Sequence, residues 1–164
     1  MGTPGCREPR IVWVLSAKRR YGRLVKFFVD SNILVYSARP CPQQKACAGI
    51  VEAVAAGADG YLSTAVLEEV WHIETRGIAG PLAGLTLHAY SIFSPLLPVT
   101  DDAFRLAIAL DVNRLGTNDR LHAGTCAAHG IGVICTGDAG FDGVPGLRRV
   151  DPLDEAALQP LLRG

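Results

Sequence analysis

The chain alternates short apolar segments with longer helical stretches, and this alternation limits the folds that are open to it. Strands are expected at residues 26–30, 60–63, 97–99, 131–136 and 147–150. Helices are expected at residues 43–56, 64–75, 81–93, 100–116 and 118–129, with Thr64 and Thr100 as N-terminal caps. Parallel strands need long, usually helical connections. The alternation therefore predicts an α/β fold, with a parallel sheet of about five strands and helices on both faces.

Residues 25–164 are expected to form a single domain, because the regular alternation begins there and 49% of the chain is apolar. Residues 1–24 hold six basic side chains and one acidic side chain, which gives +5. The other ten basic and fifteen acidic side chains give −5. We interpret the basic segment as an extension: a basic arm for nucleic acid, a disordered tail, or the product of a start codon assigned too far upstream.

The sequence indicates a soluble, cytoplasmic protein. No apolar run approaches the roughly 20 residues that span a bilayer, and no secretory signal is recognisable. The five cysteines are an odd number without a C-x-x-C pair, which argues against a disulfide framework and against a structural zinc site. His122 and Cys126 could share a helix face as two zinc ligands would, but no second ligand pair accompanies them. A half-buried helix face is the interpretation we prefer.

Acidic side chains follow several of the predicted strands. Asp30 ends the first strand, and Thr136 and Asp138 follow the fourth. Asp119 begins a helix that would face the same rim of the sheet, and Glu69 lies in the helix after the second strand. Ligands of open parallel sheets bind beyond the carboxyl ends of the strands. Gathered carboxylates repel one another unless cations or protons neutralise them, and an oxygen-rich site suits Mg²⁺ or Mn²⁺.

Glu68 and Glu69 are adjacent, and helical geometry separates them. At about 100° per residue, Glu69 lies about 60° from Val66 on the buried face, and Glu68 about 160° away. Glu69 is therefore the expected ligand.

Four segments resemble, in order, the motifs of the PIN domain family. They are residues 29–34 (VDSNIL), 63–69 (STAVLEE), 118–123 (NDRLHA) and 136–142 (TGDAGFD). The resemblance covers about residues 25–152. The compact size and the segment VPGL at 144–147 are similar to the VapC-like toxins of toxin–antitoxin pairs.

This resemblance implies a three-layer sandwich with the strand order 3-2-1-4-5 and Mg²⁺- or Mn²⁺-dependent cleavage of RNA. It assigns the catalytic, metal-binding role to Asp30, Glu69, Asp119 and Asp138. It also implies a homodimer that is inhibited by a cognate small antitoxin. In this order the direction of strand succession reverses between the first and fourth strands. Ligands of open parallel sheets bind at such a point, which agrees with the placement of the acids at the carboxyl ends of these strands.

Several further residues are expected to help. Four polar side chains would orient water or carboxylates, or else act as caps and turns: Ser31, Asn32, Asn118 and Thr136. Arg120 stands where the family usually has a small residue, and we interpret it as a phosphate contact. Gly140 replaces an acid often found after Asp138, which leaves Asp142 as an auxiliary residue.

Three alternatives were weighed. A PIN nuclease of RNA processing would carry the same residues as a toxin. A PIN fold that only binds RNA or protein is disfavoured by the complete set of four acids. A phospho-acceptor signalling domain would need an acidic pair on the first strand and a lysine after a late strand, yet no lysine follows Lys45.

Overall fold

The computed structural model describes residues 25–163, which form a four-stranded parallel sheet with helices around it. The strands are β1 (Phe27–Val29), β2 (Gly60–Tyr61), β3 (Val133–Cys135) and β4 (Arg148–Val150). Their order is β2-β1-β3-β4, and all three neighbouring pairs are parallel. The predicted α/β class is confirmed, and the basic segment 1–24 lies outside the described residues.

The observed order equals strands 2-1-4-5 of the predicted arrangement, and the expected third strand at 97–99 is absent as a strand. Leu97 makes a single parallel bridge with Ser63 beside the end of β2. Its N–H donates to Leu62 O at 2.9 Å, and its carbonyl accepts from Thr64 N at 3.0 Å. Pro98 has no N–H to extend the ladder, so the pairing stops at one residue.

Three helices begin and end close to their predicted limits: α2 (Gln44–Ala55), α3 (Thr64–Arg76) and α6 (Thr117–Ala128). The predicted cap of α3 was wrong by one residue, because the side chain of Ser63, and not that of Thr64, accepts from Val66 N at 3.2 Å. Thr100 caps α5 (Asp101–Ala109) as expected. This helix ends before the predicted limit at Gly116, since Leu110 already has extended backbone angles.

Two helices were missed. The first, α1 (Ser31–Ser37), starts directly after β1, and the other, α7 (Glu155–Leu162), ends the described chain. With seven and eight residues, both are too short for a clear helical period. A 3-10 turn, η1 (Ala139–Phe141), follows β3. Because α1 starts at the strand end, it turns the chain back at the rim where the acids were predicted.

The helix α4 (Leu85–Phe93) begins four residues later than expected and borrows its cap. Gly84, at its N-terminus, has no side chain to offer. Glu74 of α3 supplies the acceptor instead, taking Gly84 N at 2.6 Å and Thr86 N at 2.9 Å. A carboxylate at a helix N-terminus also interacts favourably with the helix dipole. Glu74 thus fixes α4 against α3.

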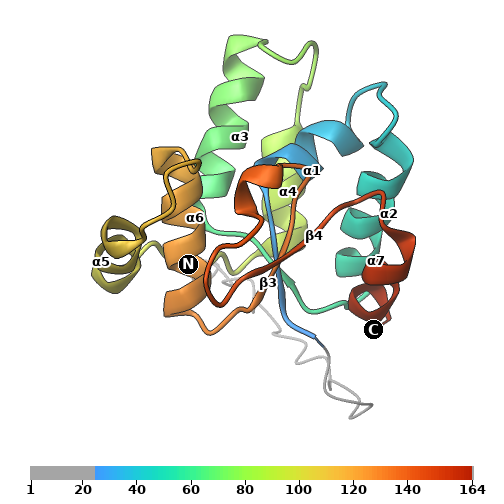
Figure 1. Cartoon of the computed structure of the whole chain (residues 1–164). Helices are drawn as coiled ribbons and strands as arrows, with labels where there is room; N and C mark the ends of the chain where they lie inside the picture. The colour runs from blue at the N-terminus through green and yellow to red at the C-terminus, as the bar shows by residue number, and fades with distance from the viewer. Residues whose placement is uncertain (1–24, 164) are drawn as a thin grey trace, which may run out of the picture.

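The helices form layers on the two faces of the sheet. In Figure 1, α5 and α6 lie on one side of the strands and α2 and α7 on the other. The strands β1 and β3 between them are fully buried. None of the helices within residues 25–163 is long and apolar enough to cross a membrane.

The helices α5 and α6 touch at their backbones. A Cβ added to Gly124 of α6 would lie 2.3 Å from Ala103 O and 2.9 Å from Ala107 Cβ. These contacts are shorter than any side chain tolerates, so the two helices would have to separate. Gly124 is therefore required by packing.

We predict that Gly124→Ala lowers the free energy of unfolding by about 1–3 kcal/mol, the usual cost of overpacking. Gly49 of α2 is the matched control, because a Cβ there would meet nothing within 4 Å. Gly49→Ala should raise the free energy of unfolding by about 0.5–1 kcal/mol, since alanine is favoured in a helix interior. Denaturant unfolding of both variants measures the two signs, and equal effects would contradict the close contact of α5 and α6.

Candidate metal centre

Asp30 lies at the junction of four chain segments. It follows β1, and its backbone N–H donates to Cys135 O of β3 at 3.2 Å. Its carboxylate caps α1 by accepting from Ser31 N at 2.7 Å. The other carboxylate oxygen accepts from Asn32 Nδ2 and from the Thr136 hydroxyl, each at 2.6 Å. With only 4% of the residue exposed, Asp30 is a buried and fully hydrogen-bonded acid.

Thr136 extends this network into the loop after β3. Its hydroxyl also accepts from Asn32 Nδ2 at 2.7 Å and from Asp138 N at 3.0 Å. The Asn32 side-chain oxygen accepts from Gly137 N at 3.1 Å. The loop that carries Asp138 is therefore attached to the side chains that hold Asp30. Asn32 and Thr136 thus hold the Asp30 carboxylate by hydrogen bonds, and their part in a metal centre stays a prediction.

Glu69 reaches the same rim from α3. Its Oε2 lies 3.3 Å from Nε2 of His122, on α6. About a third of the Glu69 side chain is exposed, whereas Glu68 is fully on the outer surface. The orientation that helical geometry predicted for the two glutamates is therefore observed. The hydrogen bond to His122 lowers the pKa of Glu69, and a hydrogen bond from Ser31 acts in the same direction.

Asp119 and Asp138 complete the set. Asp119 lies in the first turn of α6, where Oδ2 accepts from Gly116 N at 3.3 Å. Asp138 precedes η1, and its Oδ1 accepts from Gly140 N at 2.7 Å. Asp30, Asp119 and Asp138 thus lie at helix starts, whereas Glu69 lies in the second turn of α3.

The charges of these acids act on one another. Burial raises the pKa of Asp119, and the negative charges of Asp138 and Glu69 raise it further. Burial also raises the pKa of Asp30, with a smaller contribution from Glu69. Within residues 25–163, no lysine or arginine forms an ion pair with any of the four acids. The cluster thus holds negative charge that the described side chains do not neutralise.

A divalent cation fits this donor set. The candidate ligands are carboxylate oxygens, the ligands that Mg²⁺ and Mn²⁺ prefer. No three acid, histidine or cysteine side chains of the described residues are arranged to hold an ion as they stand. Carboxylates repel one another in the absence of a cation, which gives a physical reason for their separation. Burial is the main cause of the raised pKa values of Asp30 and Asp119, and a bound cation would stabilise the charged form of both acids.

The remaining predicted residues have mixed surroundings. Asn118 is exposed in the first turn of α6, beside Asp119. Asp142 pairs with Arg149, with Oδ1 at 2.8 Å from Nε, and this ion pair lowers the pKa of Asp142. Arg149 also pairs with Asp151 at 2.9 Å. The geometry of Asp142 supports a structural link between η1 and β4, and its auxiliary role stays a prediction.

Arg120 holds the loop that follows α5. Its guanidinium donates to the carbonyls of Leu110 at 2.7 Å, Val112 at 3.0 Å and Leu115 at 3.2 Å. All three nitrogens are therefore engaged with backbone. Contact with phosphate stays a prediction, and the observed arrangement supports a loop-holding role instead.

His122 contacts Glu69, although the sequence did not assign it to this site. The sequence offered it with Cys126 as a possible pair of zinc ligands, and the structure buries both residues. Burial raises the pKa of the Cys126 thiol, which disfavours the thiolate that zinc requires. The three-residue spacing of His122 from Asp119 puts both side chains near one helix face, but nothing in the sequence indicated the contact with Glu69.

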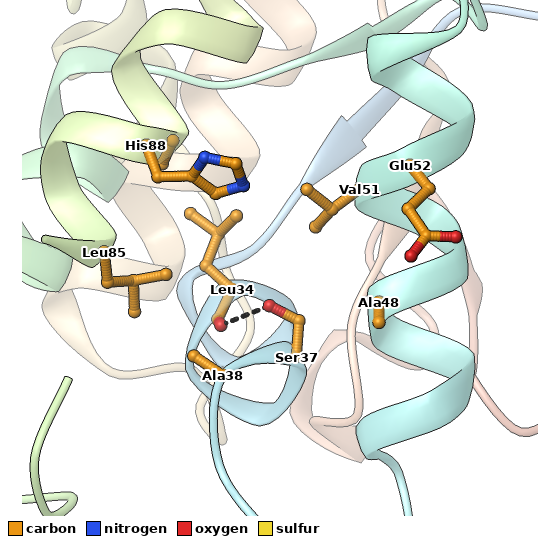
Figure 2. A pocket seen from close by; sticks show the side chains of 9 residues that line it. Leu34, Ser37, Ala38, Ala48, Val51, Glu52, Leu85 and His88 are labelled. Atoms are coloured by element: carbon orange, nitrogen blue, oxygen red, sulfur yellow. Dashed lines mark hydrogen bonds between the residues drawn. The ribbon is translucent and has the colours of Figure 1, made fainter.

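A hollow of about 270 Å³ lies between α1, α2 and α4, and none of the four acids lines it. Figure 2 shows Leu34, Val51 and Leu85 around it, with Glu52 and His88 at its sides. Ser37 does not present a free hydroxyl, since it donates to Leu34 O at 2.7 Å. The hollow is mainly apolar and contains none of the clustered acids, so it is a poor place for chemistry on phosphate.

Known proteins resemble this chain in its family motifs and its fold. The model of the family described as PIN domain matches residues 27–147. Among solved structures, the chain is similar to the crystal structure of VapBC2 from Rickettsia felis bound to a DNA fragment from their promoter. The TM-score is 0.60 at 17% sequence identity, over 77% of this chain and 98% of that chain. No curated protein matches the chain by sequence.

We predict that Asp30→Asn raises the melting temperature of the metal-free protein at pH 7.5. Folding raises the pKa of Asp30, so its contribution to stability is present below the unfolded pKa and is lost as the pH rises through the folded value. Asparagine is uncharged and avoids this loss. The difference from the wild type should shrink as the pH falls towards about 4.

Asp142→Asn is the control of opposite sign. The folded pKa of Asp142 is lowered, so its contribution is present above the unfolded pKa and is lost as the pH falls through the folded value. This variant should melt at a lower temperature than the wild type at pH 7.5. Thermal melts in the presence of a chelator test both, and a clear loss of stability in Asp30→Asn at pH 7.5 would show that its hydrogen bonds outweigh its desolvation.

Proposed function

This chain belongs to the PIN domain family, and we propose that it is a metal-dependent endoribonuclease. The single observation that carries the proposal is the cluster of Asp30, Glu69, Asp119 and Asp138 at the rim of the sheet. The structure describes no lysine or arginine paired with these acids. Such a cluster lowers the stability of the fold. Binding of a cation that assists phosphodiester cleavage would explain why the chain carries it.

The four acids would hold Mg²⁺ or Mn²⁺. When bound, such ions lower the pKa of a water for attack on phosphorus and stabilise the oxygen that leaves. The residues of the chain supply the geometry. Asp30 is held by Ser31, Asn32 and Thr136 in one orientation, so it needs little reorganisation to act as a ligand.

The other acids reach the centre from less buried positions. Asp119 lies at the N-terminus of α6, where the helix dipole favours negative charge, including that of a phosphate group. Asp138 is exposed on the loop after β3 and is open to solvent on the side from which a substrate would approach. A buried, fixed Asp30 and a solvent-exposed Asp138 suit a site that binds both a cation and RNA.

We further propose that the protein is cytoplasmic and acts as the toxin of a toxin–antitoxin pair, as a homodimer that a small antitoxin inhibits. The fold that the chain shares with VapBC2 of Rickettsia felis supports the proposal of a toxin. A nuclease of RNA processing would have the same catalytic centre. The product of a small neighbouring gene that binds the chain and stops the cleavage would identify the toxin.

Incubation of the purified protein with total RNA tests the activity. Cleavage is expected with Mn²⁺ or Mg²⁺ and should be lost on addition of a chelator. The variants Asp30→Asn and Asp119→Asn should be inactive while they remain folded, because each removes a ligand from the cluster. Cleavage that persists in these variants would place the chemistry elsewhere.

A sharper prediction compares the two adjacent glutamates. Glu69→Gln should reduce the rate of RNA cleavage at least tenfold, which is about 1.4 kcal/mol of transition-state stabilisation, because Glu69 faces the rim. Glu68→Gln should change the rate little, since Glu68 points to solvent on the same helix. Both rates are measured at one Mn²⁺ concentration. The reverse ranking would remove Glu69 from the centre.

A further inference from the structure

We propose that His122 is a positioning residue of the metal centre, which orients the carboxylate of Glu69 by donating a hydrogen bond from Nε2 to Oε2. This inference rests on the proposed function. It starts from a histidine that is only 1% exposed and lies 3.3 Å from a carboxylate of the cluster. Ser31 acts on the same carboxylate through a weaker hydrogen bond, so His122 supplies the larger part of this hold.

The direction of the hydrogen bond follows from chemistry. An ionised carboxylate only accepts, so the hydrogen must lie on Nε2 of His122. The opposite nitrogen, Nδ1, is buried and has no hydrogen-bond partner among the described residues. A buried N–H without a hydrogen-bond acceptor costs free energy. The hydrogen of the neutral ring is therefore placed on Nε2, and Nδ1 carries none. The imidazole thus presents its one donor to Glu69.

The ring has little freedom to turn away. Phe28 of β1 packs against it, with the two ring centroids 6.0 Å apart and the planes tilted by 38°. His122 also lies one turn after Asp119 on α6, whereas Glu69 belongs to α3. One helix therefore supplies both an acid of the cluster and the donor that fixes a second acid from another helix.

The orientation matters because the side chain of Glu69 is long and only partly buried. About a third of its side chain is exposed, and glutamate has three rotatable side-chain bonds. A hydrogen bond to Oε2 restricts these rotations and leaves the other oxygen free for the cation. Partners that orient ligands in this way typically change metal affinity by about 10–100-fold when they are removed.

The test is the affinity of the full chain for Mn²⁺, measured by titration calorimetry on wild type, His122→Leu and His122→Gln. Leucine fills a similar space without a donor, whereas the amide of glutamine can reach the position of Nε2. We expect the Mn²⁺ dissociation constant to rise about tenfold or more in His122→Leu and to return close to the wild-type value in His122→Gln. The melting temperature of metal-free His122→Leu should not fall, because the unpaired Nδ1 is removed.

Two controls make the result specific. Thr125→Val changes another fully buried polar residue of α6, whose hydroxyl donates only to Leu121 O of its own helix, and it should leave the affinity unchanged. In a Glu69→Gln background, His122→Leu should add no further loss of affinity, since the ligand that it orients is already absent. Additive losses, together with a lower melting temperature, would indicate a structural role and overturn the inference.

The outcomes also separate this inference from the proposed function. If wild type binds Mn²⁺, Glu69→Gln weakens binding and His122→Leu does not, only the positioning role fails. If wild type does not bind Mn²⁺ at all, the proposed function fails and the inference with it. Should His122→Leu not fold, His122→Asn replaces it, because that amide is too short to reach Glu69. Equal affinities of the asparagine and glutamine variants would then overturn the positioning role.

Discussion

The rim of this protein depends on one buried carboxylate. Asp30 joins the end of β1 to the start of α1, and through Thr136 and Asn32 to the loop after β3. The hydrogen-bond partners of its carboxylate all donate to it, so they stabilise the charged form. Burial acts in the opposite direction and raises the pKa of Asp30. The fold thus maintains a charge that it does not itself neutralise.

Neighbouring residues of the motif at 136–142 have different surroundings and different roles. Thr136 and Asn32 hold Asp30 in place, whereas Asp138, two residues after Thr136, is left exposed. Arg149 is engaged with Asp142 and Arg120 with backbone carbonyls, and neither forms an ion pair with the rim acids. Structural arginines and unpaired acids therefore occupy different parts of the same loops.

Much of this arrangement could be predicted from the sequence, because it depends on local pattern. The short strand-like segments located all four observed strands within a few residues, and the helical period placed Glu69 inward and Glu68 outward. The rest depends on contacts between distant residues. The cap of α4 comes from Glu74 in another helix, the strand at 97–99 reduces to one bridge, and the contact of His122 with Glu69 joins α6 to α3. No local pattern contains that information.

The single bridge at Leu97 has a consequence for how other chains approach the sheet. An unpaired edge strand offers N–H and C=O groups on which a second chain adds as a further strand. Here Leu97 occupies that edge at the end of β2, and Pro95 and Pro98 on either side have no N–H to donate. The segment therefore covers the end of this edge without forming a strand itself. Addition of a second chain as a further strand is disfavoured at this point.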